Sequence, residues 1–66
     1  MSIVKVIELI AESPTSWEDA VSTAIAKASK SVHGIKSVYV KDFEAMVDND
    51  KVVSYRVITK VSFILD

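Results

Sequence analysis

The side chains of this 66-residue chain offer little for covalent or acid–base chemistry. There is no Cys and only one His, His33, so thiol catalysis and a Cys/His zinc site are excluded. The single Gly leaves no glycine-rich loop that could cradle a phosphate. Carboxylates occur in two close pairs, Asp42 with Glu44 and Asp48 with Asp50. Solvated charges and turns are the ordinary explanation for such pairs, so we expect no catalytic residues and a protein that is not an enzyme.

Two other groups of side chains could bind a ligand without catalysis. Residues 48–50 (Asp-Asn-Asp) supply oxygen atoms, but the Gly and the later Glu of an EF-hand calcium loop are absent, so a turn is the simpler interpretation. Aromatic and cationic residues are interleaved further along the chain: Tyr39, Phe43 and Tyr55 with Lys36, Lys41 and Arg56. Such a mixture can stack a planar ligand. Ordinary cross-strand pairs at a subunit interface are the simpler interpretation.

The elements that must position these side chains begin with a strand and a helix. Residues 3–11 are rich in β-branched side chains and predict a strand with apolar residues on both faces. Thr15 and Ser16 are both suitable N-caps, and Thr15 with Glu18 fits a capping box. Apolar or small residues then recur at helical spacing over residues 17–32, which predicts a helix of about four turns that rests one face on a sheet. Gly34 stands at a plausible C-cap.

The second half of the chain predicts a long hairpin. Residues 52–65 alternate regularly, with Val57, Val61 and the other odd-numbered residues on one face. Residues 35–47 form the preceding strand, and residues 48–50 form the turn between the two. A bulge in residues 35–47 would exchange their faces, so the facing of this strand stays open. The predicted order is β-α-β-β, and one helix cannot cover so long a hairpin.

The length and net charge of the chain limit the kinds of partner that it is expected to bind. A chain of this size has a marginal core by itself, and its mean hydropathy of +0.31 and 50% hydrophobic residues point to burial against copies of itself. A net charge of −1 lacks the basic surplus typical of nucleic-acid binding. The uncharged segments are far shorter than the roughly 18 apolar residues of a membrane span, and no signal segment is evident. We expect one cytoplasmic domain over residues 1–66 that contacts neither nucleic acid nor membrane.

Four segments resemble the dodecin family: residues 4–8 (VKVIE), 13–20 (SPTSWEDA), 55–57 (YRV) and 60–63 (KVSF). The resemblance extends over essentially the whole chain. It implies an α+β fold in which a three-stranded antiparallel sheet wraps around one helix, and twelve copies that form a hollow shell with cubic 23 symmetry. It also implies non-catalytic binding or storage of a flavin, riboflavin or FMN, at subunit interfaces. Some dodecins bind coenzyme A, and some that lack the flavin-stacking Trp are described as calcium dodecins.

The resemblance places the binding site at five residues, two of which depart from the flavin-binding pattern. The stacking Trp of the second strand falls at Ser37, and the Gln of the third strand falls at Arg56, directly after Tyr55; Asp42 keeps the acid near the ribityl chain, and Lys36 completes the set. A guanidinium donates hydrogen bonds but accepts none, so Arg56 suits an anion better than a flavin edge. With flavin as the default ligand of the family, we expect a homododecameric binding or storage protein for flavin or a related small ligand, with a site around Lys36, Ser37, Asp42, Tyr55 and Arg56. The alternative is a structural shell that binds calcium, coenzyme A or no specific ligand.

Overall fold

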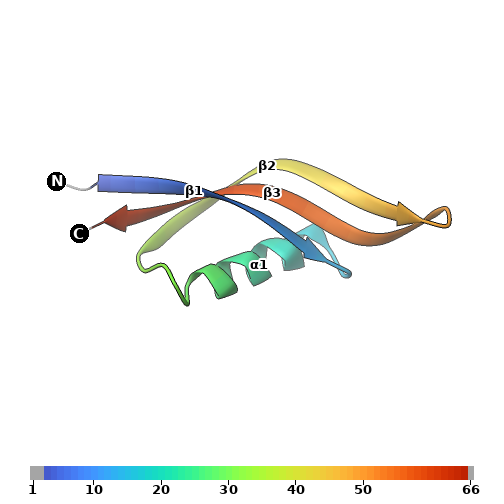
Figure 1. Ribbon diagram of the computed structural model, residues 1–66, viewed down its shortest axis with the longest axis horizontal. Coiled ribbons are helices and arrows are strands. Elements are labelled where there is room, and N and C mark those ends of the chain that lie inside the picture. Colours follow the sequence, from blue (N-terminus) through green and yellow to red (C-terminus); the bar gives the residue numbers. More distant parts are fainter. Residues whose placement is uncertain (1–2, 66) are drawn as a thin grey trace.

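The computed structural model describes residues 3–65 and has the predicted element order. Strand β1 (Ile3–Ser13) is followed by helix α1 (Trp17–Ala28) and by strands β2 (Ile35–Asp48) and β3 (Lys51–Leu65). Both neighbours of β3 pair with it in antiparallel fashion, so the strand order is β1-β3-β2. The three strands curve along one side of α1 (Figure 1). The predicted β-α-β-β fold, with one sheet wrapped around one helix, is confirmed.

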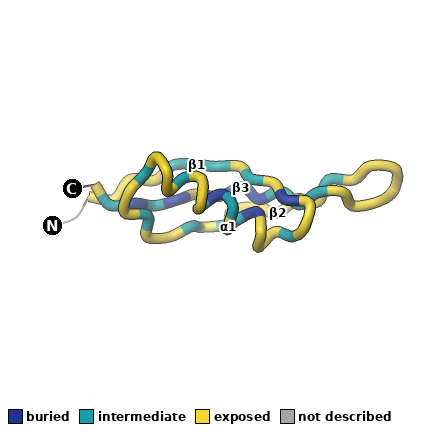
Figure 2. The backbone as a smooth tube through the Cα atoms, turned by 90° about the horizontal axis from the view of Figure 1, so that it is seen from below, coloured by how far each residue is buried: buried dark blue, intermediate teal, exposed yellow. Residues whose placement is uncertain are grey.

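The core lies between α1 and the face of β3 that carries the odd-numbered residues. Val57, Val61 and Phe63 are buried there against Ala20 and Ala24 of the helix. The same face buries Thr59, whose hydroxyl donates to the carbonyl of Leu9 at 2.8 Å, so its polar group is satisfied. Figure 2 shows the buried residues as separate dark-blue stretches where α1 lies against the sheet, while the end of the hairpin is largely exposed. The predicted face of residues 52–65 is therefore confirmed, and the two small alanines allow the close approach of helix to sheet.

The start of α1 is fixed by local hydrogen bonds. Ser16 is the N-cap, and its Oγ accepts from the backbone N–H of Asp19 at 3.0 Å. The buried Ser13 donates its hydroxyl to Asp19 Oδ2 at 2.6 Å and accepts from the N–H of Thr15 at 3.0 Å. Of the two N-caps that the sequence offered, the structure therefore uses Ser16. No helix among residues 3–65 is long and apolar enough to cross a membrane.

The predicted end of the helix is wrong. Helix α1 ends at Ala28, with Ser29 as its C-cap, so it spans 12 residues and not the 16 of the predicted range. Gly34 lies beyond the helix, at the entrance to β2, with φ of +74°. Its carbonyl accepts from the N–H of Ile64 at 3.1 Å, and a Cβ would stand 3.2 Å from the Ile64 oxygen. The glycine is therefore needed for a close crossing of β3 and not for helix capping.

The hairpin of β2 and β3 turns at Asn49 and Asp50, which have φ of 52° and 63°. These residue types tolerate the left-handed region, so the predicted turn is confirmed. Both strands are slightly longer than predicted, because pairing continues to Asp48 and Lys51. The β2 register shifts at three places: between Ile35 and Ser37, between Val40 and Asp42, and between Met46 and Val47. These irregularities are the reason that simple alternation could not fix the facing of β2.

Candidate functional site

The face of the sheet opposite α1, called the outer face below, carries most of the candidate residues. Its side chains are the even-numbered residues of β3, which alternate with buried Val57, Thr59 and Val61, and their partners on the neighbouring strands. From the hairpin side to the terminal side, the cross-strand rows in the order β1-β3-β2 are Glu12-Arg56-Glu44, Ile10-Ile58-Asp42, Glu8-Lys60-Tyr39 and Val6-Ser62-Ser37.

Arg56 lies between two carboxylates on this face. Its Nε donates to Glu12 Oε1 at 2.7 Å, and its Nη1 lies 3.8 Å from Glu44 Oε1. These are the only ion pairs among residues 3–65. Asp42 occupies the adjacent row, so the four side chains together carry two negative charges in excess. The positive charge of the guanidinium is therefore already neutralised by carboxylates of the same chain. Arg56 is for this reason not expected to attract the phosphate or carboxylate of a ligand.

Ser37 lies near the other end of the outer face. Its hydroxyl hydrogen-bonds across the strands with that of Ser62. Tyr39, two residues along the chain, is 65% exposed and is the aromatic side chain of this face. Lys36 falls in the first bulge, where no β3 residue is paired with it. The position at which the resemblance expects an aromatic platform is thus polar, with an exposed tyrosine beside it.

Tyr55 belongs to the opposite face and packs under α1. Its ring centroid lies 4.9 Å from that of Trp17 in an edge-to-face arrangement, and Phe43 meets Trp17 at 5.9 Å. The indole N–H of Trp17 donates to the backbone carbonyl of Glu44 at 2.9 Å. Trp17 therefore anchors the first turn of the helix on the hairpin. Glu44 touches both faces, through its carbonyl on one side and its carboxylate on the other.

A single chain does not bring the five candidate residues together. Asp42 and Arg56 are neighbours, whereas Ser37 is opposite Ser62, six residues from Arg56 along β3. At about 3.3 Å per residue this separates the two positions by roughly 20 Å. A ligand that contacts both must therefore lie between two chains. The sequence pattern did not indicate Glu12 as a partner of Arg56, because the predicted first strand ends one residue before Glu12.

Among residues 3–65 no three His, Cys, Asp or Glu side chains lie close enough together to hold an ion. A hard cation such as Ca²⁺ takes about six to eight oxygen ligands, which include carboxylates, carbonyls and water. Side-chain carboxylates from this part of a single chain therefore do not by themselves form such a set.

Trp17→Phe tests the anchor between helix and hairpin. The substitution keeps an aromatic ring but removes the hydrogen bond to Glu44, so we expect a loss of about 1 kcal/mol in the free energy of unfolding. Urea unfolding followed by circular dichroism measures this loss. Tyr55→Phe keeps the ring contact with Trp17 and should change stability by less than the uncertainty of the measurement. Equal stability of wild type and Trp17→Phe would contradict the anchoring role of the indole N–H.

Known proteins are similar to this chain in both sequence and fold. The dodecin family profile matches residues 3–66. Calcium dodecin of Mycobacterium tuberculosis is 41% identical over 63 residues, which cover 96% of this chain and 89% of that protein. A crystal structure of calcium dodecin from M. tuberculosis, described as having a novel calcium-binding site, superposes with a TM-score of 0.85 at 38% identity and covers 98% of this chain and 93% of that one.

A dodecin mutant from Thermus thermophilus superposes with a TM-score of 0.94 at 27% identity, over 100% of this chain and 98% of that one. The likeness therefore includes all of β1, α1, β2 and β3, and the family profile extends over all but the first two residues of the sequence. This chain belongs to the dodecin family.

Proposed function

We propose that this protein is a non-catalytic binding protein whose chains form a homododecameric shell and hold a small ligand where the outer faces of neighbouring chains meet. One observation carries the proposal: apolar side chains on the β1 edge of the outer face are uncovered in the single chain. Ile10 is 63% exposed, and Val4 and Val6 are more than half exposed. Exposed apolar side chains that gather along one edge are typical of an interface.

Calcium is the ligand that the outer face favours. Glu12, Asp42 and Glu44 gather carboxylate oxygens in two adjacent rows, and Arg56 neutralises only one of their three charges. Two such faces brought together would double the number of oxygen atoms around one ion, which a hard cation requires. The similarity to a protein named calcium dodecin supports the same choice. Coenzyme A is less favoured, because its phosphates would meet a guanidinium that already has two carboxylate partners.

Flavin is the second candidate, and Tyr39 is the observation in its favour. This side chain is 65% exposed on the outer face and lies one row from Ser37, so it offers an aromatic surface near the position where the family resemblance expects a Trp. An aromatic stack contributes about 0.5–1.5 kcal/mol beyond the buried area. Ser37 itself provides only a hydroxyl that already has a partner.

Titration of chelator-treated protein with CaCl₂ tests the preferred ligand. We expect saturable heat in calorimetry and a rise in the melting temperature, since an ion at one hundred times its dissociation constant stabilises the folded state by about 2.7 kcal/mol. Asp42→Asn should weaken binding at least tenfold. Glu18→Gln, which removes one negative charge on the helix side of the sheet, is the matched control and should leave the titration unchanged.

Three outcomes would change the assignment. An assembled protein that gives neither heat nor a thermal shift with millimolar Ca²⁺ excludes calcium. Saturable quenching of riboflavin or FMN fluorescence by the same sample would then favour flavin. If neither ligand binds, the chain forms a structural shell. A monomer in multi-angle light scattering would refute the proposed assembly itself.

A further inference from the structure

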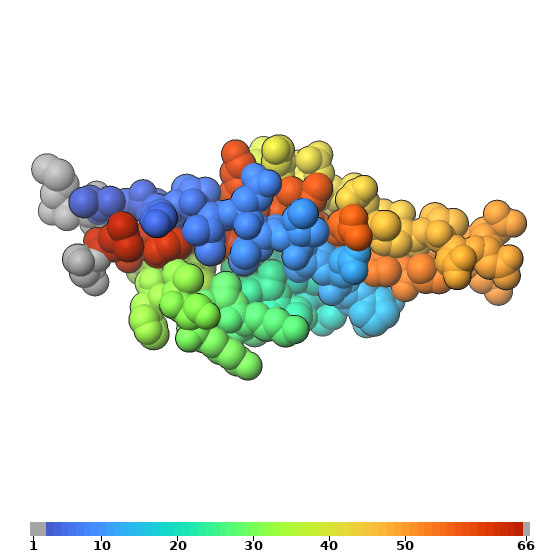
Figure 3. All heavy atoms as spheres, in the orientation of Figure 1, coloured from blue at the N-terminus to red at the C-terminus, as the bar shows by residue number. Residues whose placement is uncertain are grey.

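The end of the hairpin is a two-stranded ribbon with apolar side chains on both of its faces. Val47 and Val52 are directly opposite each other and share one face, whereas Met46, the residue before Val47, points to the other face. Val53 is the extra residue of the bulge between Val52 and Ser54. The exposed fractions of Val47, Val52 and Val53 are 65%, 50% and 50%. Figures 1 and 3 show that this ribbon extends beyond the ends of α1 and β1, so nothing in the chain covers it. An uncovered two-stranded ribbon is marginally stable in water, and apolar residues on both faces suit insertion between two surfaces.

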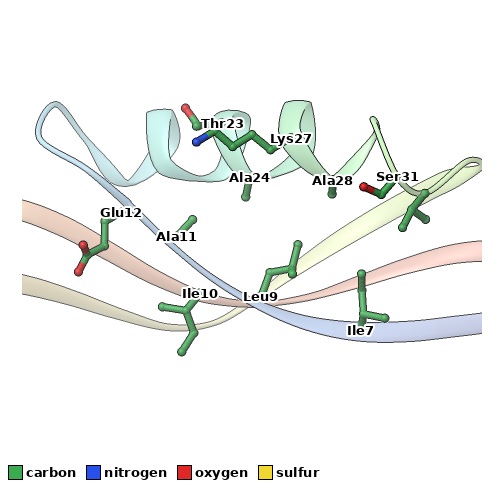
Figure 4. Close-up of a pocket in the computed structure, with 11 residues that line it drawn as sticks. Ile7, Leu9, Ile10, Ala11, Glu12, Thr23, Ala24, Lys27, Ala28 and Ser31 are labelled. Atoms are coloured by element: carbon green, nitrogen blue, oxygen red, sulfur yellow. The ribbon is translucent and has the colours of Figure 1, made fainter.

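A groove lined mainly by apolar side chains lies between α1 and β1, away from the end of the hairpin. It encloses about 490 Å³, within the range of roughly 300–1,000 Å³ that is typical of binding sites. Figure 4 shows Ile7 and Leu9 of β1 pointing toward Ala24 and Ala28 of the helix across an open space. Ser31 and Val32 line one end of this space. The alanines leave room that a longer helix side chain would fill.

The charges around the two surfaces are complementary. The turn of the ribbon carries Asp48, Asp50 and Lys51, a net charge of −1. Two charged residues line the groove, Glu12 and Lys27. Glu12 is already paired with Arg56, whereas Lys27 has no carboxylate partner within residues 3–65, because both ion pairs there belong to Arg56. The carboxylates of an inserted ribbon would give Lys27 a partner.

A second hollow, on the β2 side of the helix, fits the ribbon less well. It is smaller, about 360 Å³, and apolar, but the charged residue that lines it is Glu18. The acidic turn of the ribbon would therefore be repelled there. Trp17 and Phe43 also occupy this side and already contact each other.

We propose that residues 47–53 of one chain insert into the groove between β1 and α1 of the next copy. This inference rests on the proposed assembly, for which it names the contacting surfaces. The ribbon and the groove are different surfaces, so the contact is heterologous, and repetition must close it into a ring within a finite shell. The groove shares Ile10 and Glu12 with the outer face, so the ribbon contact and the ligand contact adjoin each other along β1.

Disulfide trapping tests the contact, because the chain contains no cysteine of its own. A variant with both Val52→Cys and Ala28→Cys should give, under mild oxidation, one dominant covalent oligomer on a non-reducing gel, whose size is that of the ring. The matched control joins Val52→Cys with Val21→Cys, which places the second thiol in the smaller hollow. We expect at least tenfold less covalent oligomer from the control.

Several results would overturn the inference. A covalent dimer from Val52→Cys alone would show that ribbons pair with each other, and stronger trapping at position 21 would place the ribbon in the other hollow. If light scattering shows an intact shell but neither pair traps, the proposed assembly stands and this contact is wrong. If the protein is a monomer, the assembly itself fails.

Charge reversal provides a second, independent readout. Lys27→Asp should raise the protein concentration at which half of the shell dissociates by tenfold or more, because it faces Asp48 and Asp50 in the inserted ribbon. Adding Asp48→Lys to that variant should restore most of the loss. Lack of rescue would contradict the pairing of Lys27 with the ribbon.

Discussion

Replacing Ile10 with Asp is expected to dissociate the shell into folded or partly folded subunits, although the side chain is 63% exposed in a single chain. A change at such an exposed position normally alters stability by no more than about 0.5 kcal/mol. In the proposed assembly the same carboxylate would be buried against the outer face of a neighbour, without a partner, at a cost of several kcal/mol. The substitution is informative because these two expected costs differ so much. Multi-angle light scattering measures the mass of the variant, and thermal unfolding measures its loss of stability.

The control for this experiment must reproduce the change in charge without touching the sheet. Lys30→Ala also lowers the net charge by one and lies in an exposed position after the end of α1. We expect it to keep the mass of the assembly and to shift the melting temperature by only a degree or two. If Ile10→Asp assembles as well as Lys30→Ala, then the outer face is not an interface. The ligand proposed for that interface would have to be placed elsewhere.

Much of the fold follows from local patterns in the sequence. The alternation of residues 52–65 identifies the buried face of β3 because this strand pairs on both sides without interruption on its β1 edge. The turn at Asn49 and Asp50 is also evident, since few residue types accept positive φ. The helix end was misplaced for a physical reason: Val32 continues the apolar spacing, but the chain leaves the helix at Ser29 to reach the crossing at Gly34.

The candidate site was less accessible to sequence reasoning. Alternation alone cannot predict that Asp42 and Ser37 lie on the same face, because the bulge between Val40 and Asp42 adds one residue to β2. The partnership of Arg56 with Glu12 depends on the register of β1 and β3, which joins residues 44 positions apart in the chain. Tyr55 and Arg56 are adjacent in sequence, yet one packs under the helix and the other faces away from it.

Restoring the residue types of flavin-binding dodecins should restore flavin affinity. We expect the double variant Ser37→Trp with Arg56→Gln to bind riboflavin or FMN at least tenfold more tightly than the unmodified protein. The Trp supplies a stacking surface on an exposed part of the outer face. The Gln replaces a side chain that only donates hydrogen bonds with an amide that both donates and accepts. Quenching of flavin fluorescence measures the affinity without interference from Trp17.

Comparison of the single variants with the double variant tests whether Ser37 and Arg56 line the same site. Within one chain Ser37 and Arg56 are roughly 20 Å apart, too far to contact one flavin ring. If neighbouring chains contribute the two residues to one site, the gain from the double variant should exceed the sum of the gains from the single variants. Lys30→Trp, which adds an exposed Trp away from the sheet, controls for non-specific stacking and should bind no better than wild type. Additive gains would place the two residues in separate sites, and an unchanged titration would show that neither lines a flavin pocket.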